Sequence, residues 1–215
     1  PRPDTWAPWP IEELLGAPGR GVNQRVSSTT QTSSNVSSEG ANALLPLEKD
    51  MLKRLTTFVN CFGLSMIAVC ETLHIGISFN KSGVCVGITA PGSRVATLIS
   101  LYREGTHGTL SIFMNEACFA YFVQSMTGGM IAPDPDDPIA LSVAGEVSNM
   151  VSGNAVTSLS ERGYSGLDIT PPQILTGSNI KTLRLPEETG YTFTLPFLVE
   201  NDPDRIIYQV LLFRR

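Results

Sequence analysis

Long segments with helical apolar spacing alternate with short strand-like runs, and this alternation restricts the fold more than any other feature of the sequence. The first helical segment begins near Leu45 and repeats apolar residues every three or four positions through Ile67. Runs rich in β-branched and aromatic residues follow it, separated by glycine-containing turns, at 74–79, 84–89, 95–102 and 109–114. This half of the chain therefore predicts a helix followed by antiparallel strands.

The second half repeats this order after a short apolar helix predicted at 116–126. Asp137 and Pro138 suit the N-cap and first position of a further helix, which should run to about Arg162. Strand-like runs then lie at 166–169, 180–185, 191–199 and 206–213. The order predicts an α+β fold, with helices packed on a mostly antiparallel sheet and two roughly repeated halves.

The first 44 residues differ in composition from the rest of the chain. They contain both tryptophans and several prolines but few Ile, Val or Phe residues, and a Ser/Thr-rich run occupies 27–38. Such a segment is typical of a flexible leader and linker without a core of its own. We therefore expect residues 1–44 to precede a folded domain at 45–215.

Charge and cysteine content argue against several classes of protein. A net charge of −5 without a basic run disfavours nucleic-acid binding. The most apolar window, 61–70, is shorter than the roughly 20 residues of a membrane span, so no membrane segment is expected. The four cysteines lack CxxC spacing, which predicts reduced thiols in a cytoplasmic protein rather than a metal site or disulfides.

The helix predicted from Pro138 carries a row of polar side chains. Ser142, Glu146 and Asn149 follow an i, i+4, i+7 pattern and fall within roughly 60° of one another, opposite an apolar stripe. Gly145 and Gly153 lie near the same face, although glycine inside a helix costs roughly 1 kcal/mol relative to alanine. Missing side chains there would let the backbone of a partner approach closely. The residues alone also allow a second interpretation, an ordinary solvated helix face.

A resemblance to the CheC/CheX/FliY phosphatase family favours the first interpretation. The signature of this family is Asp or Ser, three residues, Glu, two residues, Asn, 22 residues and Pro, and this sequence fits it throughout. The matching residues are Ser142, Glu146, Asn149 and Pro172. The surrounding segments 145–150, 153–155 and 168–172 resemble the CheX-type versions, and the likeness extends over about 45–213.

The first predicted helix indicates the single-site CheX type. CheC-type members usually carry the motif in two related helices. When the two halves are aligned, Asn60 takes the place of Asn149, but Thr57 and Lys53 take the places of the Glu and the Asp or Ser. Gly83 stands at the proline position. The resemblance therefore implies one competent site.

The resemblance implies an enzyme that hydrolyses the aspartyl-phosphate of a phosphorylated CheY-like receiver domain in chemotaxis signalling. The phosphatase would need no cofactor of its own, because the receiver supplies Mg²⁺. Asn149 would position the attacking water and Glu146 would pair with a lysine of the receiver. Ser142 would contact the receiver as well, and Pro172 would shape the segment beside the helix.

Two further expectations concern partners. The resemblance to CheX-type members implies a possible homodimer. The predicted sheet also has edge strands without an evident cover, which is compatible with pairing between two copies. The same fold could also serve a non-catalytic adaptor that binds receivers, or a component of the flagellar switch. The presence of both Glu146 and Asn149 favours the enzyme, because a binding module has no need of an amide that positions water.

Overall fold

The computed structural model of the chain describes residues 49–178, 180 and 190–214. Its elements are α2 (Lys49–Thr72), β1 (Ile77–Phe79), the 3₁₀ helix η1 (Lys81–Gly83), β2 (Cys85–Val86), β3 (Ser93–Arg103), β4 (Thr106–Asn115), α3 (Glu116–Thr127), α4 (Pro138–Glu161), β5 (Asp168–Ile169), β6 (Gln173–Thr176), β7 (Gly190–Val199) and β8 (Asp202–Arg214). The expected leader at 1–44 and the domain boundary at residue 45 lie outside the described residues, as does all but Ile180 of the strand expected at 180–185.

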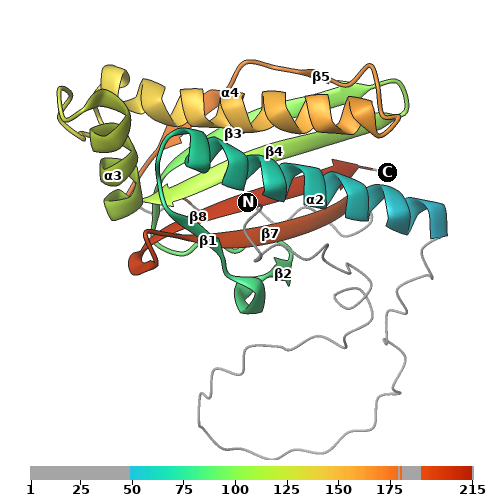
Figure 1. The fold of residues 1–215 in the computed structure, drawn as a ribbon, viewed down its shortest axis with the longest axis horizontal. Coiled ribbons are helices and arrows are strands. Elements are labelled where there is room, and N and C mark those ends of the chain that lie inside the picture. Colours follow the sequence, from blue (N-terminus) through green and yellow to red (C-terminus); the bar gives the residue numbers. More distant parts are fainter. Residues whose placement is uncertain (1–48, 179, 181–189, 215) are drawn as a thin grey trace, which may run out of the picture.

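In the described part of the chain, eight strands form one antiparallel sheet in the order β1-β7-β8-β4-β3-β5, with β2 beside β7 and β6 beside β3. The long helices α2 and α4 lie side by side across one face of this sheet, and α3 stands at one end (Figure 1). The prediction of an α+β fold is confirmed. The repeat of the two halves stays a prediction, although each long helix is followed by short strands and a long hairpin.

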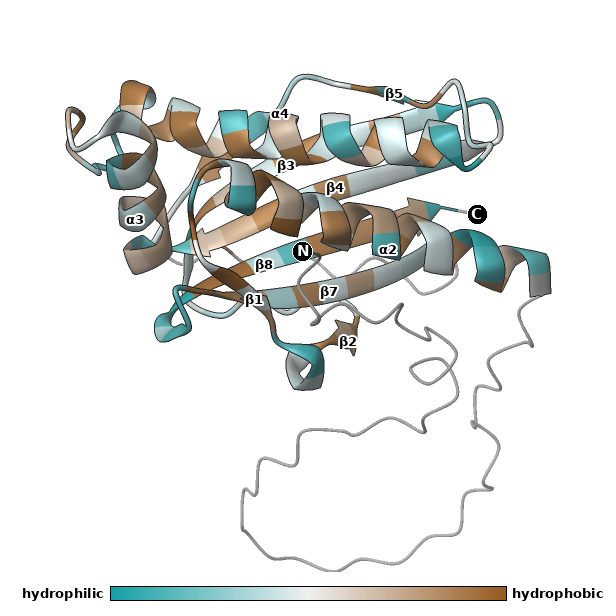
Figure 2. Ribbon diagram, in the orientation of Figure 1, coloured by the Kyte–Doolittle hydropathy of each residue, from teal (hydrophilic) through white to brown (hydrophobic). Residues whose placement is uncertain are grey.

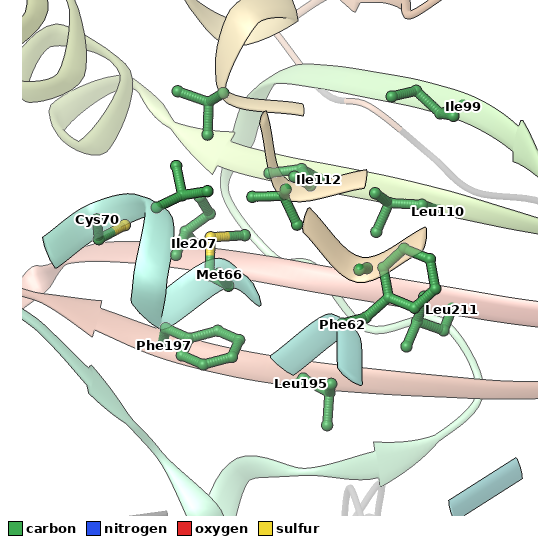
Figure 3. Close-up of a cluster of buried hydrophobic side chains, with 14 of the residues drawn as sticks. Phe62, Met66, Cys70, Ile99, Leu110, Ile112, Leu195, Phe197, Ile207 and Leu211 are labelled. Atoms are coloured by element: carbon green, nitrogen blue, oxygen red, sulfur yellow. The ribbon is translucent and has the colours of Figure 1, made fainter. Parts of the chain in front are cut away.

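Apolar side chains fill the space between the helix layer and the sheet. Figure 3 shows that this core combines α2 with the inner faces of the four long strands; its labelled residues are Phe62, Met66, Cys70, Ile99, Leu110, Ile112, Leu195, Phe197, Ile207 and Leu211. Hydrophilic residues recur along α4 with hydrophobic ones between them (Figure 2). Each long helix is therefore amphipathic, with one face in the core and the other available to solvent.

The helix α2 is long and apolar enough to cross a membrane when judged by length and composition alone. However, 61% of its most apolar window is buried inside the fold. Its side chains Phe62, Met66 and Cys70 are fully buried against the sheet. This burial identifies α2 as a core helix of the domain.

Gln209 on β8 is an exception in this core. Its side chain is fully buried, and within the described residues neither of its amide atoms has a hydrogen-bond partner. Its cross-strand neighbours Ile112 and Leu195 are buried as well. A buried amide without partners loses its hydration without compensation. We therefore expect Gln209→Met, which is similar in length, to raise the free energy of unfolding by about 1 to 2 kcal/mol in urea denaturation.

Gln124→Met is a matched control, because Gln124 is exposed on α3 and its replacement should change the stability little. A lower stability of the Gln209→Met variant would contradict this account. It would mean that a partner such as a buried water satisfies the amide in solution.

Candidate functional site

The helix α4 begins where the sequence predicts. Asp137 is the N-cap, and its side chain accepts a hydrogen bond from the backbone amide of Ile139 at 2.9 Å. Pro138 occupies the first turn, where its missing N–H is not needed. The start of the helix that carries the polar row is therefore fixed by local interactions.

The buried face of α4 fixes the rotation of the helix on the sheet. The apolar residues of this face are almost inaccessible to solvent; they are Ala140, Val143, Ala144, Val147, Val151 and Ala155. Ser148 is buried on the same side, and its hydroxyl hydrogen-bonds that of the buried Thr97 on β3. Because successive residues are about 100° apart around a helix, this contact turns the polar row away from the sheet.

The predicted row occupies the outward face of α4. Ser142 and Glu146 are exposed and Asn149 is half-buried. The Ser142 hydroxyl donates to the carbonyl oxygen of Ile139 at 2.6 Å, and the Asn149 carbonyl accepts from the Ser152 hydroxyl at 3.1 Å. Within the ranges that the structure describes, the Glu146 carboxylate and the Asn149 side-chain amide have no hydrogen-bond or ionic partner. Both groups are therefore available to another molecule.

Gly145 faces its own chain rather than a partner. It is buried, and a Cβ atom at this position would lie 3.3 Å from Ile174 Cδ1 and 3.6 Å from Pro172 Cγ. The segment that leads into β6 thus occupies the space beside this glycine. The interpretation of Gly145 as an open approach for the backbone of a partner is wrong, because its missing side chain serves a contact within the fold.

Gly153 has a different environment. It is half-buried, and a Cβ atom at this position would meet nothing within 4 Å. The described fold therefore provides no packing reason for a glycine inside α4 at this point. Its role in letting a partner approach stays a prediction.

Pro172 lies beside the helix, immediately before β6. It is half-buried, and β6 pairs with β3 so that Ile174 is the cross-strand neighbour of Thr97. Thr97 thus takes part in two contacts that hold α4 in place. Its hydroxyl hydrogen-bonds Ser148 on α4, and its strand β3 pairs with β6, which carries the Ile174 side chain beside Gly145. The structure brings Pro172 to the flank of the polar row, not into it.

The corresponding region of α2 is built differently. The Asn60 side chain donates to the carbonyl of Thr56 at 2.9 Å, and the Thr57 hydroxyl donates to the carbonyl of Lys53 at 2.9 Å. These hydrogen bonds stay within one helix, and no carboxylate stands at the position that corresponds to Glu146. The polar groups of α2 therefore do not reproduce the arrangement on α4.

The buried thiols offer no competing nucleophile. Burial raises the pKa of Cys70 to about 12, and it also raises the pKa of Cys61 and of Cys118. A thiol with a raised pKa stays protonated at neutral pH, and the protonated form is a poor nucleophile. Among the residues with described positions, no group of three or more His, Cys, Asp or Glu side chains is placed to hold a metal ion.

The hydroxyl pair between Ser148 and Thr97 was not predicted, although a serine among apolar neighbours is a signal that could have revealed it. Ser148→Ala or Thr97→Val leaves the other hydroxyl buried without its partner, so each change should lower the free energy of unfolding by about 1.5 kcal/mol. The free energy of unfolding of the double variant should fall by less than the sum of the two single losses. Urea denaturation of the wild type, the two single variants and the double variant would measure this.

Ser142→Ala provides the control for this cycle, because Ser142 is exposed and its loss should change stability by less than about 0.5 kcal/mol. Strictly additive losses in the double variant would contradict the coupling of the two hydroxyls.

Comparisons with known proteins agree with this architecture. The family model described as "Chemotaxis phosphatase CheX" matches residues 95–196. The CheY-P phosphatase CheX of Thermotoga maritima is 31% identical over 134 residues, which make up 62% of this chain and 81% of that protein. A CheC-like superfamily protein from Shewanella sp. PV-4 has a TM-score of 0.64 and 25% identity, over 74% of this chain and 98% of its own.

A chain in the crystal structure of the CheX–CheY–BeF₃–Mg²⁺ complex from Borrelia burgdorferi has the same fold. Its TM-score is 0.56 and its identity 20%, over 74% of this chain and 98% of that one. The identity and coverage of the Thermotoga protein decide the family, and the matching family model agrees with it. The chain belongs to the chemotaxis phosphatase CheX family.

Proposed function

We propose that this protein hydrolyses the aspartyl-phosphate of a CheY-like receiver domain, and that Glu146 and Asn149 enter the phosphorylation site of the receiver. One observation carries the proposal: a carboxylate and an amide, three residues apart on the outward face of an anchored helix, have no partner in the described part of the chain. The related Thermotoga protein is named as a CheY-P phosphatase, which supports this choice of substrate.

Asn149 positions the attacking water. Its amide can accept a hydrogen bond from the water through Oδ1 and donate one through Nδ2, which fixes the water in line with the phosphorus. The water oxygen forms a bond to phosphorus while the bond between phosphorus and the aspartate oxygen breaks. The products are the free aspartate carboxylate and inorganic phosphate, and a proton of the water is released to the phosphate or to solvent. Catalysis by positioning suits phosphoryl transfer, which needs little covalent assistance.

Glu146 sets the register of the complex. Its carboxylate pairs with a lysine of the receiver, and a charged hydrogen bond of this kind fixes orientation as well as affinity. Ser142, one turn toward the start of the helix, contacts the receiver, and Gly153 leaves room at the other end of the row. Gly145 and Pro172 support the helix from within the fold.

The receiver contributes the remaining groups. It holds the phosphorylated aspartate, the lysine and the Mg²⁺ that neutralises phosphoryl oxygens. The similar fold in the CheX–CheY–BeF₃–Mg²⁺ complex supports a CheY-like partner. We place this reaction in the cytoplasm, and we keep the homodimer as a prediction that the two edges of the sheet allow.

The test is to incubate the purified full chain with a phosphorylated CheY-like receiver and to follow the loss of phosphate from the receiver. The proposal expects the receiver to lose its phosphate several times faster than it does alone. A chain that binds the phosphorylated receiver without accelerating the loss is an adaptor, and the enzymatic proposal then fails.

A further inference from the structure

The N-terminal end of α4 presents an exposed apolar side chain in line with the proposed reactive groups. Ile139 in the first turn is 62% exposed, and Met130 in the preceding loop is 87% exposed. Neither belongs to the apolar core of the described residues. Isoleucine is also a weaker helix former than alanine, so Ile139 gives the fold no evident advantage.

Ile139 belongs to the same ridge of α4 as the proposed site. The ridge residues are separated by three or four positions and lie within about 80° of one another around the helix axis; they are Ile139, Ser142, Glu146, Asn149 and Gly153. Glu146 is seven positions after Ile139, which is about 10 Å along the helix. A standard interface of about 800 Å² per partner is roughly 30 Å across, so a protein that reaches Glu146 and Asn149 also covers Ile139.

The surroundings of Ile139 indicate which kind of surface would meet it. The segment from Gly128 to Glu161 contains no Lys or Arg, and its acidic residues are Asp134, Asp136, Asp137, Glu146 and Glu161. Asp137 is used as the helix cap, whereas Asp136 and Glu146 are exposed. An apolar side chain within an acidic surface fits a partner that presents an apolar patch bordered by basic side chains.

We propose that Ile139 is an apolar anchor that the receiver buries when it docks, and that it determines the affinity for the receiver without taking part in hydrolysis. This inference rests on the proposed function, which names the receiver as the occupant of this face. At this end of the ridge, the Ser142 hydroxyl already donates a hydrogen bond to the backbone carbonyl of Ile139. The Ile139 side chain is therefore the larger of the two groups that a partner can still contact. An apolar anchor beside a polar reactive pair matches the division of an interface into a few residues that supply affinity and others that supply specificity.

The experiment measures binding and turnover separately. A CheY-like receiver loaded with beryllofluoride and Mg²⁺ is titrated against the full chain, and hydrolysis of the phosphorylated receiver is followed as a function of its concentration. Ile139→Ala should raise Kd and KM about tenfold and change kcat less than twofold. Ile139→Val, which keeps most of the apolar surface, should stay within about threefold of the wild-type Kd.

Leu175→Ala is the matched control. Leu175 on β6 is 52% exposed, and it pairs with Ala96, whose side chain belongs to the apolar cluster on the sheet face opposite α4. Leu175→Ala removes the same number of carbon atoms as Ile139→Ala, and it should leave Kd and kcat unchanged. Melting temperatures of all variants check that the fold persists.

The outcomes separate this inference from the proposed function. A wild-type Kd for Ile139→Ala overturns the anchor, whatever the hydrolysis measurements show. Binding of the wild-type chain without hydrolysis overturns the phosphatase proposal, while a tenfold loss of affinity in Ile139→Ala still supports the anchor. Absence of binding by the wild-type chain overturns both.

Discussion

Asn149→Ala is expected to lower the rate of receiver dephosphorylation by about a hundredfold or more while leaving the affinity for the receiver nearly unchanged. The reason is that the proposed role of Asn149 is to hold a water in line, which matters only in the transition state. The fold should not suffer, because the side-chain amide has no partner among the residues described and alanine is a better helix former. Single-turnover hydrolysis and a binding titration of the same variant give the two quantities.

Two further variants sharpen this test. Asn149→Asp keeps the shape but removes the donor and adds a negative charge beside the phosphoryl group, so it should be at least as slow as the alanine variant. Asn154→Ala removes the same side chain from an exposed position five residues further along α4, and it should retain the wild-type rate. Wild-type hydrolysis by Asn149→Ala would contradict the proposed catalytic role of Asn149.

The helices of this fold could be predicted because their sequence signals are local. The apolar spacing of α2 and α3, and the Asp137–Pro138 start of α4, each determine an element through contacts within a few residues. The helix α4 was predicted to end at about Arg162, and it ends one residue earlier at Glu161. Antiparallel pairing of β3 with β4 also followed from the composition of the two strands and the short glycine-containing turn between them.

The short strand β6 was not predicted, because its signal is not local. Gln173 to Thr176 follow two prolines and include polar, largely exposed residues, so their composition is typical of a loop. They become a strand because β3 offers an unpaired edge and Ile174 packs toward Gly145. Only the folded sheet supplies these two conditions.

The strand-like runs predicted at 191–199 and 206–213 leave a longer connection than the two residues that join β7 to β8. Both central residues, Glu200 and Asn201, have positive φ angles of 55° and 52°, which makes a tight turn that glycine usually favours. The Glu200 carboxylate accepts hydrogen bonds from the Gly76 amide at 2.6 Å and the Tyr121 hydroxyl at 2.9 Å. These long-range contacts hold a non-glycine residue in the turn, and the local sequence gives no sign of them.

The candidate site also has features that could be predicted from the sequence and features that could not. The outward row of Ser142, Glu146 and Asn149 could be predicted, because helical periodicity alone places these residues together. The role of Gly145 could not, since its contacts with Pro172 and Ile174 join segments more than 25 residues apart. The Ser148 hydroxyl likewise depends on Thr97, a residue of a distant strand.

Glu146→Ala should behave differently from Asn149→Ala, because the proposed role of Glu146 is to bind the lysine of the receiver. Loss of a charged pair that becomes desolvated in a complex costs about 2 kcal/mol, so affinity and hydrolysis at low receiver concentration should fall together by about thirtyfold. Saturating receiver should restore much of the rate, which Asn149→Ala cannot do. Titrations of both variants with the same phosphorylated receiver compare the two roles.

The charge of Glu146 can be separated from its size. Glu146→Gln keeps the shape but not the charge, so it should lose most of the affinity and also weaken the dependence of binding on salt concentration. Glu161→Gln is the control, because it removes an exposed charge from the other end of α4 and should leave affinity unchanged. A Glu146→Gln variant that binds the receiver as the wild type does would show that no ion pair forms at this position. The register of the complex would then have to come from the apolar end of the ridge at Ile139.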